Sequence, residues 1–189
     1  MHSLLVFKDA RDRWLTTYRE QIVEYRKKFS PGGPEPLLEL TGRNIPEPYR
    51  FYRADLASGA VTPPNFTEVN IDVLPSYLPF KEKNEQGIEI AVEPFVWNGV
   101  EFDIGGEMLD TMVLADWCLK WLDVPEIHVK DSDGLLGAIH SMTMPEVREE
   151  QIHFSVDFGS APLTAVEELF ATLSRVGART VRITSRWLK

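Results

Sequence analysis

The sequence lacks the features that would place it in several large classes of protein. It has a single cysteine, Cys118, among 189 residues, so it cannot form an internal disulfide. It has no apolar signal segment near Met1 and no run of about 20 apolar residues of the kind that crosses a bilayer. These absences predict a cytoplasmic protein that neither needs disulfides nor enters a membrane.

Short catalytic motifs are missing as well. Gly159-Ser160-Ala161-Pro162 lacks the second glycine of a nucleophile elbow, so Ser160 is interpreted as a helix cap. Asp131-Ser132-Asp133-Gly134 resembles part of a calcium loop, but no glutamate follows at the required distance, so it predicts a turn. No glycine-rich loop follows a strand where it could hold phosphate. The sequence therefore favours a protein that is not an enzyme and needs no cofactor.

Zinc-site spacing is also absent, with one question left open. Cys118 has no C-x-x-C partner, and no two histidines have the close helical spacing of a zinc site. Three histidines nevertheless fall on predicted strands: His128, His140 and His153. Whether they converge in space is not decided by their spacing.

Negative charge is what the chain has in excess, and it is unevenly distributed. The net charge is −9, yet residues 81–168 alone carry 5 basic and 19 acidic side chains, a net of −14. Residues 1–80 are balanced, and residues 169–189 carry five basic side chains and no acidic one. Such a segment repels nucleic acid and anionic lipid and attracts cations. We expect a basic protein partner and no nucleic acid, with a merely solvated acidic surface as the alternative.

Apolar periodicity predicts an amphipathic helix over about 9–29, because five apolar residues recur at intervals of three and four: Leu15, Tyr18, Ile22, Tyr25 and Phe29. Residues 30–80 contain nine prolines, which exclude a long helix. We expect an ordered wrapping segment there, with short extended pieces around 37–40, 51–54 and 66–73.

The middle of the chain predicts a β-hairpin followed by a buried helix. Asn98-Gly99 between two apolar runs is a strong signal for a two-residue turn, with a β-bulge near Glu93-Pro94 to bring both runs onto the core side. Residues 107–122 are apolar on nearly every side and predict a buried central helix. Short strands are expected at 127–129 and 135–142.

The last third reads as a β-α-β unit. Alternation over 152–158 predicts a strand, the stripe from Leu163 to Val176 predicts a helix that Gly177 ends, and Val181 with Ile183 predicts a second strand parallel to the first. The expected fold is therefore α+β: one domain over 1–189, with a mixed, antiparallel-rich sheet, an N-terminal amphipathic helix, a buried central helix and a C-terminal β-α-β unit.

Two candidate sites follow from this reading. The outward face of the hairpin and its exit gather carboxylates beside an aromatic anchor, which suits a basic partner. The residues of that predicted surface are Glu89, Trp97, Glu101, Asp103, Glu107 and Asp110. Asp116 shares a helical face with apolar residues, so we expect a buried carboxylate that is either paired with an arginine or functional.

No motif assigns the chain to a family. Its profile, small, acidic and poor in motifs, is similar to that of immunity proteins that neutralise a toxin by covering it, which implies stoichiometric binding of a basic toxin or effector domain. Two alternatives stay open: a small enzyme or ligand-binding domain with a pocket near Asp116 and a histidine, and a homodimer formed through the Trp-rich helix.

Overall fold

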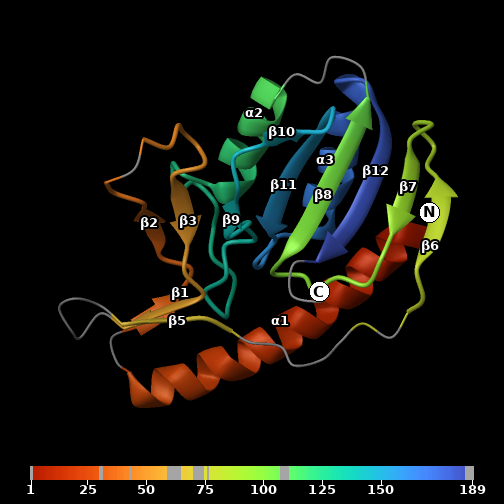
Figure 1. The fold of residues 1–189 in the computed structure, drawn as a ribbon. Helices are drawn as coiled ribbons and strands as arrows, with labels where there is room; N and C mark the ends of the chain where they lie inside the picture. The colour runs from red at the N-terminus through yellow and green to blue at the C-terminus, as the bar shows by residue number, and fades with distance from the viewer. Residues whose placement is uncertain are drawn as a thin grey trace.

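A mixed sheet forms the centre of an α+β fold, and helices pack around it (Figure 1). The computed structural model describes residues 2–29, 32–42, 44–58, 65–69, 75, 77–106 and 111–185. Within these residues the sheet has seven strands. From one edge to the other they are β10 (Glu146–Arg148), β11 (Gln151–Asp157), β8 (Val100–Gly106), β12 (Ala178–Ser185), β7 (Glu89–Val92) and β6 (Phe80–Lys83), with β9 (Ser141–Met142) beside β11.

The predicted hairpin is wrong because β12 lies between its two arms. Strand β7 pairs with β12 in parallel, and β8 pairs with the other side of β12 antiparallel. A turn does form one residue earlier than predicted, with Trp97 and Asn98 at its centre, since Gly99 N–H donates to the carbonyl of Val96 (3.1 Å). The bulge expected at Glu93-Pro94 is wrong too, because β7 ends at Val92 and a separate loop carries the next apolar residues into the core.

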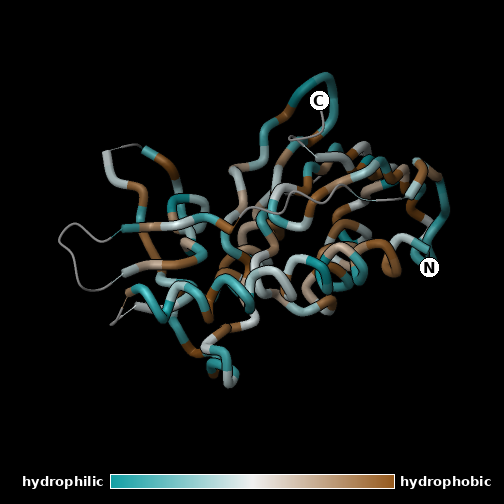
Figure 2. The backbone as a smooth tube through the Cα atoms, turned by 90° about the horizontal axis from the view of Figure 1, so that it is seen from below, coloured by the Kyte–Doolittle hydropathy of each residue, from teal (hydrophilic) through white to brown (hydrophobic). Residues whose placement is uncertain are grey.

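The predicted N-terminal helix is α1 (His2–Lys28), which begins a full two turns before Asp9. Its start is held by Glu82 of β6, whose carboxylate accepts hydrogen bonds from the N–H groups of His2 and Ser3 and from the Ser3 hydroxyl. Four residues of the expected stripe are buried, Leu15, Tyr18, Ile22 and Tyr25, whereas Phe29 lies after the helix and is 36% exposed. Hydrophilic and hydrophobic positions alternate along the helix (Figure 2). Glu82, from a strand distant in the sequence, therefore supplies the N-terminal cap of α1.

The proline-rich segment contributes short strands beside one end of α1. A three-stranded sheet is formed by β1 (Gly32–Pro34), β4 (Leu56–Ser58) and β5 (Phe66–Thr67), and a two-stranded sheet by β2 (Leu37–Glu39) and β3 (Phe51–Arg53). The extended pieces expected around 37–40 and 51–54 are confirmed. Half of the third piece, residues 70–73, lies outside the described residues, and β5 covers the first two residues of the other half.

The central helix is α2 (Thr111–Leu122), and it is buried on one side only. Trp117, Cys118 and Leu122 face the core, while Met112 is 69% exposed and Leu119 is 41% exposed. The expectation of burial on every side is wrong because α2 packs on α3 (Leu163–Arg175) and leaves its opposite face to solvent. The strand expected at 127–129 is irregular loop, and only β9 remains of the strand expected at 135–142.

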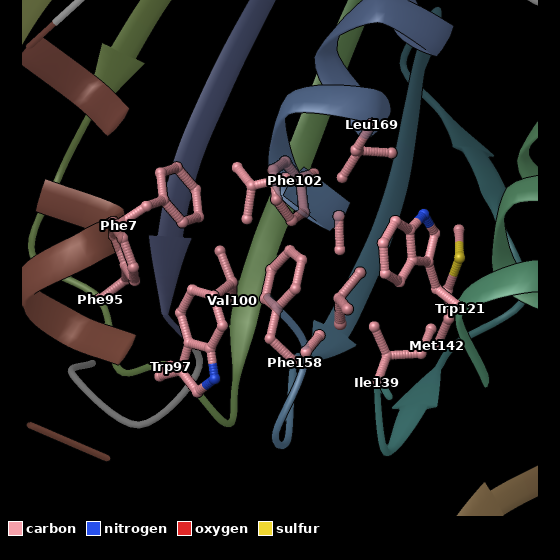
Figure 3. Packing of buried hydrophobic residues seen from close by; sticks show 14 of the residues in the cluster. Phe7, Phe95, Trp97, Val100, Phe102, Trp121, Ile139, Met142, Phe158 and Leu169 are labelled. Carbon is pink, nitrogen blue, oxygen red and sulfur yellow. The ribbon is translucent and has the colours of Figure 1, made fainter. Parts of the chain in front are cut away.

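The C-terminal β-α-β unit is confirmed, with β8 between its two strands. Strands β11 and β12 are each antiparallel to β8, so they are parallel to one another. Helix α3 lies behind the sheet in Figure 1. Apolar side chains from β8, β11 and β12 meet those of α1 and α3 in one core cluster, part of which is drawn in Figure 3. Within the described residues, no helix has the length and apolar character needed to cross a bilayer.

Candidate functional site

The predicted acidic surface is only partly assembled by the fold. Glu101 and Asp103 on β8 and Glu89 on β7 do share one face of the sheet, as their registers with β12 require. Arg182 of β12 lies between them, 3.6 Å from the Asp103 carboxylate. Glu101 is only 7% exposed and accepts a hydrogen bond from the Thr184 hydroxyl. Glu107 and Asp110 lie outside the described residues.

Trp97 cannot act as the aromatic anchor of that surface, because it is 2% exposed and belongs to the core. Its indole stacks on Phe158 with ring centroids 4.8 Å apart, and its Nε1–H donates to the carbonyl of Gly159 (2.7 Å). Figure 3 shows Trp97 among Phe7, Phe95 and Phe158. Its role is therefore packing.

Asp116 does not form the expected buried site. It is exposed, on the same side of α2 as the exposed Met112 and Leu119. The helical spacing was interpreted correctly, but that face of α2 is turned to solvent. The pocket expected near Asp116 and a histidine is not supported, since Asp116 is not among the residues that line the hollow described below.

The remaining carboxylates of residues 81–168 are spread over the molecule. Glu85 lies in the β6–β7 turn at one edge of the sheet, while Glu149 and Glu150 lie in the β10–β11 turn at the other. Several others are paired with cations of the chain itself, such as Glu93 with Arg182 (2.8 Å). The acidic segment therefore gives a negative molecule without giving a single acidic patch.

A hollow of about 390 Å³ opens between α1, the loop after α2 and the segment before α3. Its two arginines are already engaged. Arg11 donates to the carbonyl of Ala161 (2.8 Å), and Arg19 pairs with Asp133 (3.0 Å). Much of the remaining lining is apolar: Leu15, Trp121, Val129, Leu135, Leu136 and Pro162. His128, Asp131 and Ser160 also line the hollow, so its surface is partly apolar and partly polar, and the acidic Asp131 disfavours an anion there.

Hydrogen bonds with the buried side chains of Asp123 and Arg53 hold the loop beside this hollow, residues 123–130. The Asp123 carboxylate accepts hydrogen bonds from the N–H groups of Ile127 (2.9 Å) and His128 (3.1 Å). Arg53, whose side chain is fully buried, donates to the carbonyls of Leu122 (2.9 Å) and Asp123 (2.7 Å). Burial lowers the pKa of Arg53, and the nearby carboxylates oppose that shift. The loop's backbone is therefore fixed before any partner arrives.

This rigid loop displays two bare aliphatic side chains. Ile127 is 75% exposed and Val129 is 91% exposed, and Val129 forms part of the rim of the hollow. Single exposed aliphatic residues are common on protein surfaces, but two of them on a preorganised loop beside a partly apolar hollow resemble the centre of an interface. We call these two residues and the hollow the docking loop site.

Ser160 also lines the hollow, but not as the helix cap expected from the sequence. Pro162 is the N-cap residue of α3 and gives no side-chain cap. The Ser160 hydroxyl instead accepts hydrogen bonds from the N–H groups of Gly137 (2.9 Å) and Ala138 (3.2 Å), which ties the loop wall to the start of α3.

A cluster of polar side chains is buried next to this hollow. His140 is 1% exposed, with its Nε2 2.8 Å from Glu35 Oε1 and its Nδ1 2.7 Å from Asp55 Oδ1. Asp157 lies on the same side and accepts a hydrogen bond from the N–H of Gly159 (2.9 Å). We call Glu35, Asp55, His140 and Asp157 the buried histidine cluster.

Main-chain hydrogen bonds bring these four residues together from strand ends far apart in the sequence. Glu35 N–H donates to the Asp55 carbonyl (3.1 Å), and His140 N–H donates to the Asp157 carbonyl (2.8 Å). Glu35 has a φ of 57°, an uncommon conformation for a residue with a side chain. Its carbonyl accepts from Arg53 and its carboxylate from the N–H of Leu136, which hold it in place.

The pKa values of His140 and Asp157 in this cluster are strongly shifted. Burial, the largest influence, lowers the pKa of His140, but the ion pairs with Asp55 and Glu35 together with the charge of Asp157 raise it well above 6.5. Burial raises the pKa of Asp157 to about 7, against the charge of His140. A metal-free cluster is therefore a cationic imidazole surrounded by two buried acidic side chains, Glu35 and Asp55, and one partly exposed one, Asp157.

The three histidines left open by the sequence do not meet, because each has a different described partner. His128 lies 3.9 Å from Asp123, His153 lies 2.7 Å from Asp103, and His140 belongs to the buried cluster. The cluster itself was missed because its residues are separated by up to 122 positions and no local motif marks them. The docking loop site was missed because Ile127-His128-Val129 alternates like a strand.

No family model, curated protein or solved structure matches this chain.

Proposed function

We propose that this chain is a stoichiometric protein-binding domain whose partner is a basic protein, such as a toxin or effector domain that it neutralises. The observation that carries the proposal is the hydrogen-bonded docking loop with Ile127 and Val129 exposed beside a partly apolar hollow. Because the loop's backbone is already hydrogen-bonded, binding does not require it to be ordered at that moment.

Charge supports a basic partner even though the carboxylates are dispersed. A net charge of −9 attracts a cationic protein over distances beyond direct contact and so raises the rate of encounter. Affinity would then come from aliphatic side chains buried on contact, each worth about 1.5–3 kcal/mol. Long-range attraction of the partner thus comes from the charge of the whole molecule, whereas affinity comes from the two exposed aliphatic side chains of the loop.

The proposal is tested with three immobilised proteins: wild type, Ile127→Ser/Val129→Ser, and a control with Leu5→Ser/Val23→Ser. The control removes two aliphatic side chains of α1 that are 63% and 53% exposed and lie outside the docking loop site. A native lysate is passed over each, and proteins retained by wild type and control but lost from the loop variant are identified and purified.

Binding of the purified partner is then measured directly. We expect a one-to-one complex whose affinity falls about 10-fold or more for each loop substitution, mainly through faster dissociation. The association rate should fall as salt rises. Equal retention by all three proteins, or a partner of net negative charge, would refute the proposal.

A further inference from the structure

The buried histidine cluster places three potential metal ligands together. One ligand atom each from Asp55, His140 and Asp157 can be chosen so that all three lie within 4.8 Å of one another. A zinc ion about 2.1 Å from each of three tetrahedrally arranged ligand atoms holds those atoms about 3.4 Å apart. Small side-chain rotations therefore suffice to close the site around an ion.

The unsatisfied nitrogen of His140 points to a ligand independently of the carboxylates. Among the described residues, Nδ1 of this 1% exposed side chain makes no hydrogen bond, although Asp55 Oδ1 lies only 2.7 Å away, because the contact lacks the direction that a hydrogen bond needs. For a neutral imidazole, a buried nitrogen whose close polar contact is not a well-formed hydrogen bond is poorly satisfied, and this is costly. A cation bound to its lone pair would remove that cost.

Glu35 completes the pattern around the other ring nitrogen. Its Oε1 lies 2.8 Å from Nε2 of His140. A histidine that binds a metal through one nitrogen almost always donates the N–H of the other to a carboxylate or carbonyl, which fixes the ring and its tautomer. With Nε2–H donated to Glu35, Nδ1 is left to face Asp55 and Asp157.

Local charge also favours a divalent ion. The cluster holds three carboxylates, and the buried Arg53, which donates to the Glu35 carbonyl at 2.8 Å, brings one positive charge next to it. With a neutral imidazole, three negative charges and one positive charge leave a formal charge of −2. A divalent cation neutralises that charge without requiring a proton on any ligand.

We infer that Asp55, His140 and Asp157 bind a divalent transition-metal ion, with Glu35 orienting the histidine. One imidazole and two carboxylates suit Zn²⁺, which commonly takes three protein ligands and leaves a fourth position for water. Access is from the side of Asp157, which is partly exposed, whereas Asp55 and His140 are buried.

The test uses the full chain, stripped of metal with a chelator and titrated with Zn²⁺ by calorimetry. We expect one zinc per chain in a saturable phase, together with a rise in Tm. Asp157→Asn should weaken binding by about 100-fold or more, and Glu35→Gln by about 10- to 100-fold. Asp157→Asn retains a side-chain oxygen that can accept the Gly159 N–H, so the variant keeps that contact. Asp116→Asn, at an exposed carboxylate outside the cluster, should bind as wild type does.

Failure has clear forms. No zinc binding by the wild type would mean that His140 is instead an imidazolium held between Asp55 and Glu35, and equal binding by Asp157→Asn would place the zinc elsewhere. Because a variant can misfold, NMR of the His140 ring in the wild type gives a second readout: its Nδ1 resonance must shift on addition of Zn²⁺, and an unchanged resonance overturns the inference. Ile127→Ser/Val129→Ser should bind zinc normally, so this inference and the proposed docking role can fail separately.

Discussion

Replacing Arg53 by methionine should destabilise the fold far more than replacing any exposed arginine. The Arg53 guanidinium is fully buried and donates to three main-chain carbonyls, those of Leu122 (2.9 Å), Glu35 (2.8 Å) and Asp123 (2.7 Å). Methionine fills much of the same volume but donates nothing. Three carbonyls then lose their charged donor.

The expected loss follows from those contacts. A hydrogen bond from a charged group contributes about 1.5–3 kcal/mol, and removing one partner of a buried ion pair costs about 3–5 kcal/mol in total. The nearest carboxylate oxygen of Asp123 lies 3.9 Å from the Arg53 guanidinium, so this pair is loose and the carbonyl contacts dominate. Because these contributions are not additive, we expect Arg53→Met to lower the free energy of unfolding by about 3–5 kcal/mol.

Urea unfolding monitored by tryptophan fluorescence measures this loss, with Arg50→Met as the matched control. Arg50 is 36% exposed and pairs with Glu39 and Glu47 at the surface, so its replacement should change stability by about 0–1 kcal/mol. A further expectation is faster proteolysis of residues 123–130 in Arg53→Met, since two of the lost bonds anchor that loop. If Arg53→Met lost no more than Arg50→Met, the argument that Arg53 supports the docking loop would be refuted.

Three further predictions concern single sites. Gly159→Ala should lower Tm by several degrees, because the φ of Gly159 is +47° and the added Cβ would lie 2.1 Å from Cδ2 of His140. A Tm within about 1 °C of the wild type would contradict this expectation. Burial raises the pKa of the Cys118 thiol to about 12, so a thiol reagent at mildly alkaline pH should label it only after unfolding, and rapid labelling of the folded chain would show that the site is open. Glu82→Gln should cost about 0.5–1 kcal/mol by weakening the cap on α1. Burial alone would raise the pKa of Glu82, but the hydrogen-bond donors of Ser3 and His2 lower it below 4.5. The stabilisation that the Glu82 carboxylate gives is therefore present above that pH and is lost as the pH falls. Urea unfolding at neutral and acidic pH should show the stabilities of the variant and the wild type converging in acid.

Local patterns in the sequence predicted local structure well. The spacing of Leu15, Tyr18 and Ile22 identified α1, and Gly177, with a φ of 85°, ends the last helix as expected. These features depend on contacts within a few turns of chain, so sequence periodicity reports them directly.

The order of the strands in the central sheet could not be predicted from the sequence. Ile90 and Val92 have the opposite parity to Phe95 and Trp97, and a bulge within a hairpin was the simplest explanation. The structure resolves the conflict differently, because the chain leaves the sheet after Val92 and β12 occupies the place of the second arm. Nothing within that stretch encodes the arrival of a strand from 80 residues later.

The candidate sites show the same limit. Asp116 lies on the predicted helical face, but only tertiary packing decides which face of α2 meets the core. Glu35, Asp55 and His140 each follow or precede a short strand in an ordinary local setting, and hydrogen bonds between distant segments assemble them. Patterns within a window identify elements, whereas sites made by the packing of distant segments require the fold.

Because β12 lies between β7 and β8, the central sheet can be completed only after β12 has been synthesised. Strands β7 and β8 are made long before β12, and each then offers bare N–H and C=O groups along the side that β12 will cover. A nascent chain halted before that strand would hold two separate half-sheets, both open to pairing with a neighbouring molecule. Newly made chains of this protein therefore have a period of vulnerability to aggregation that ends only when the final strand inserts.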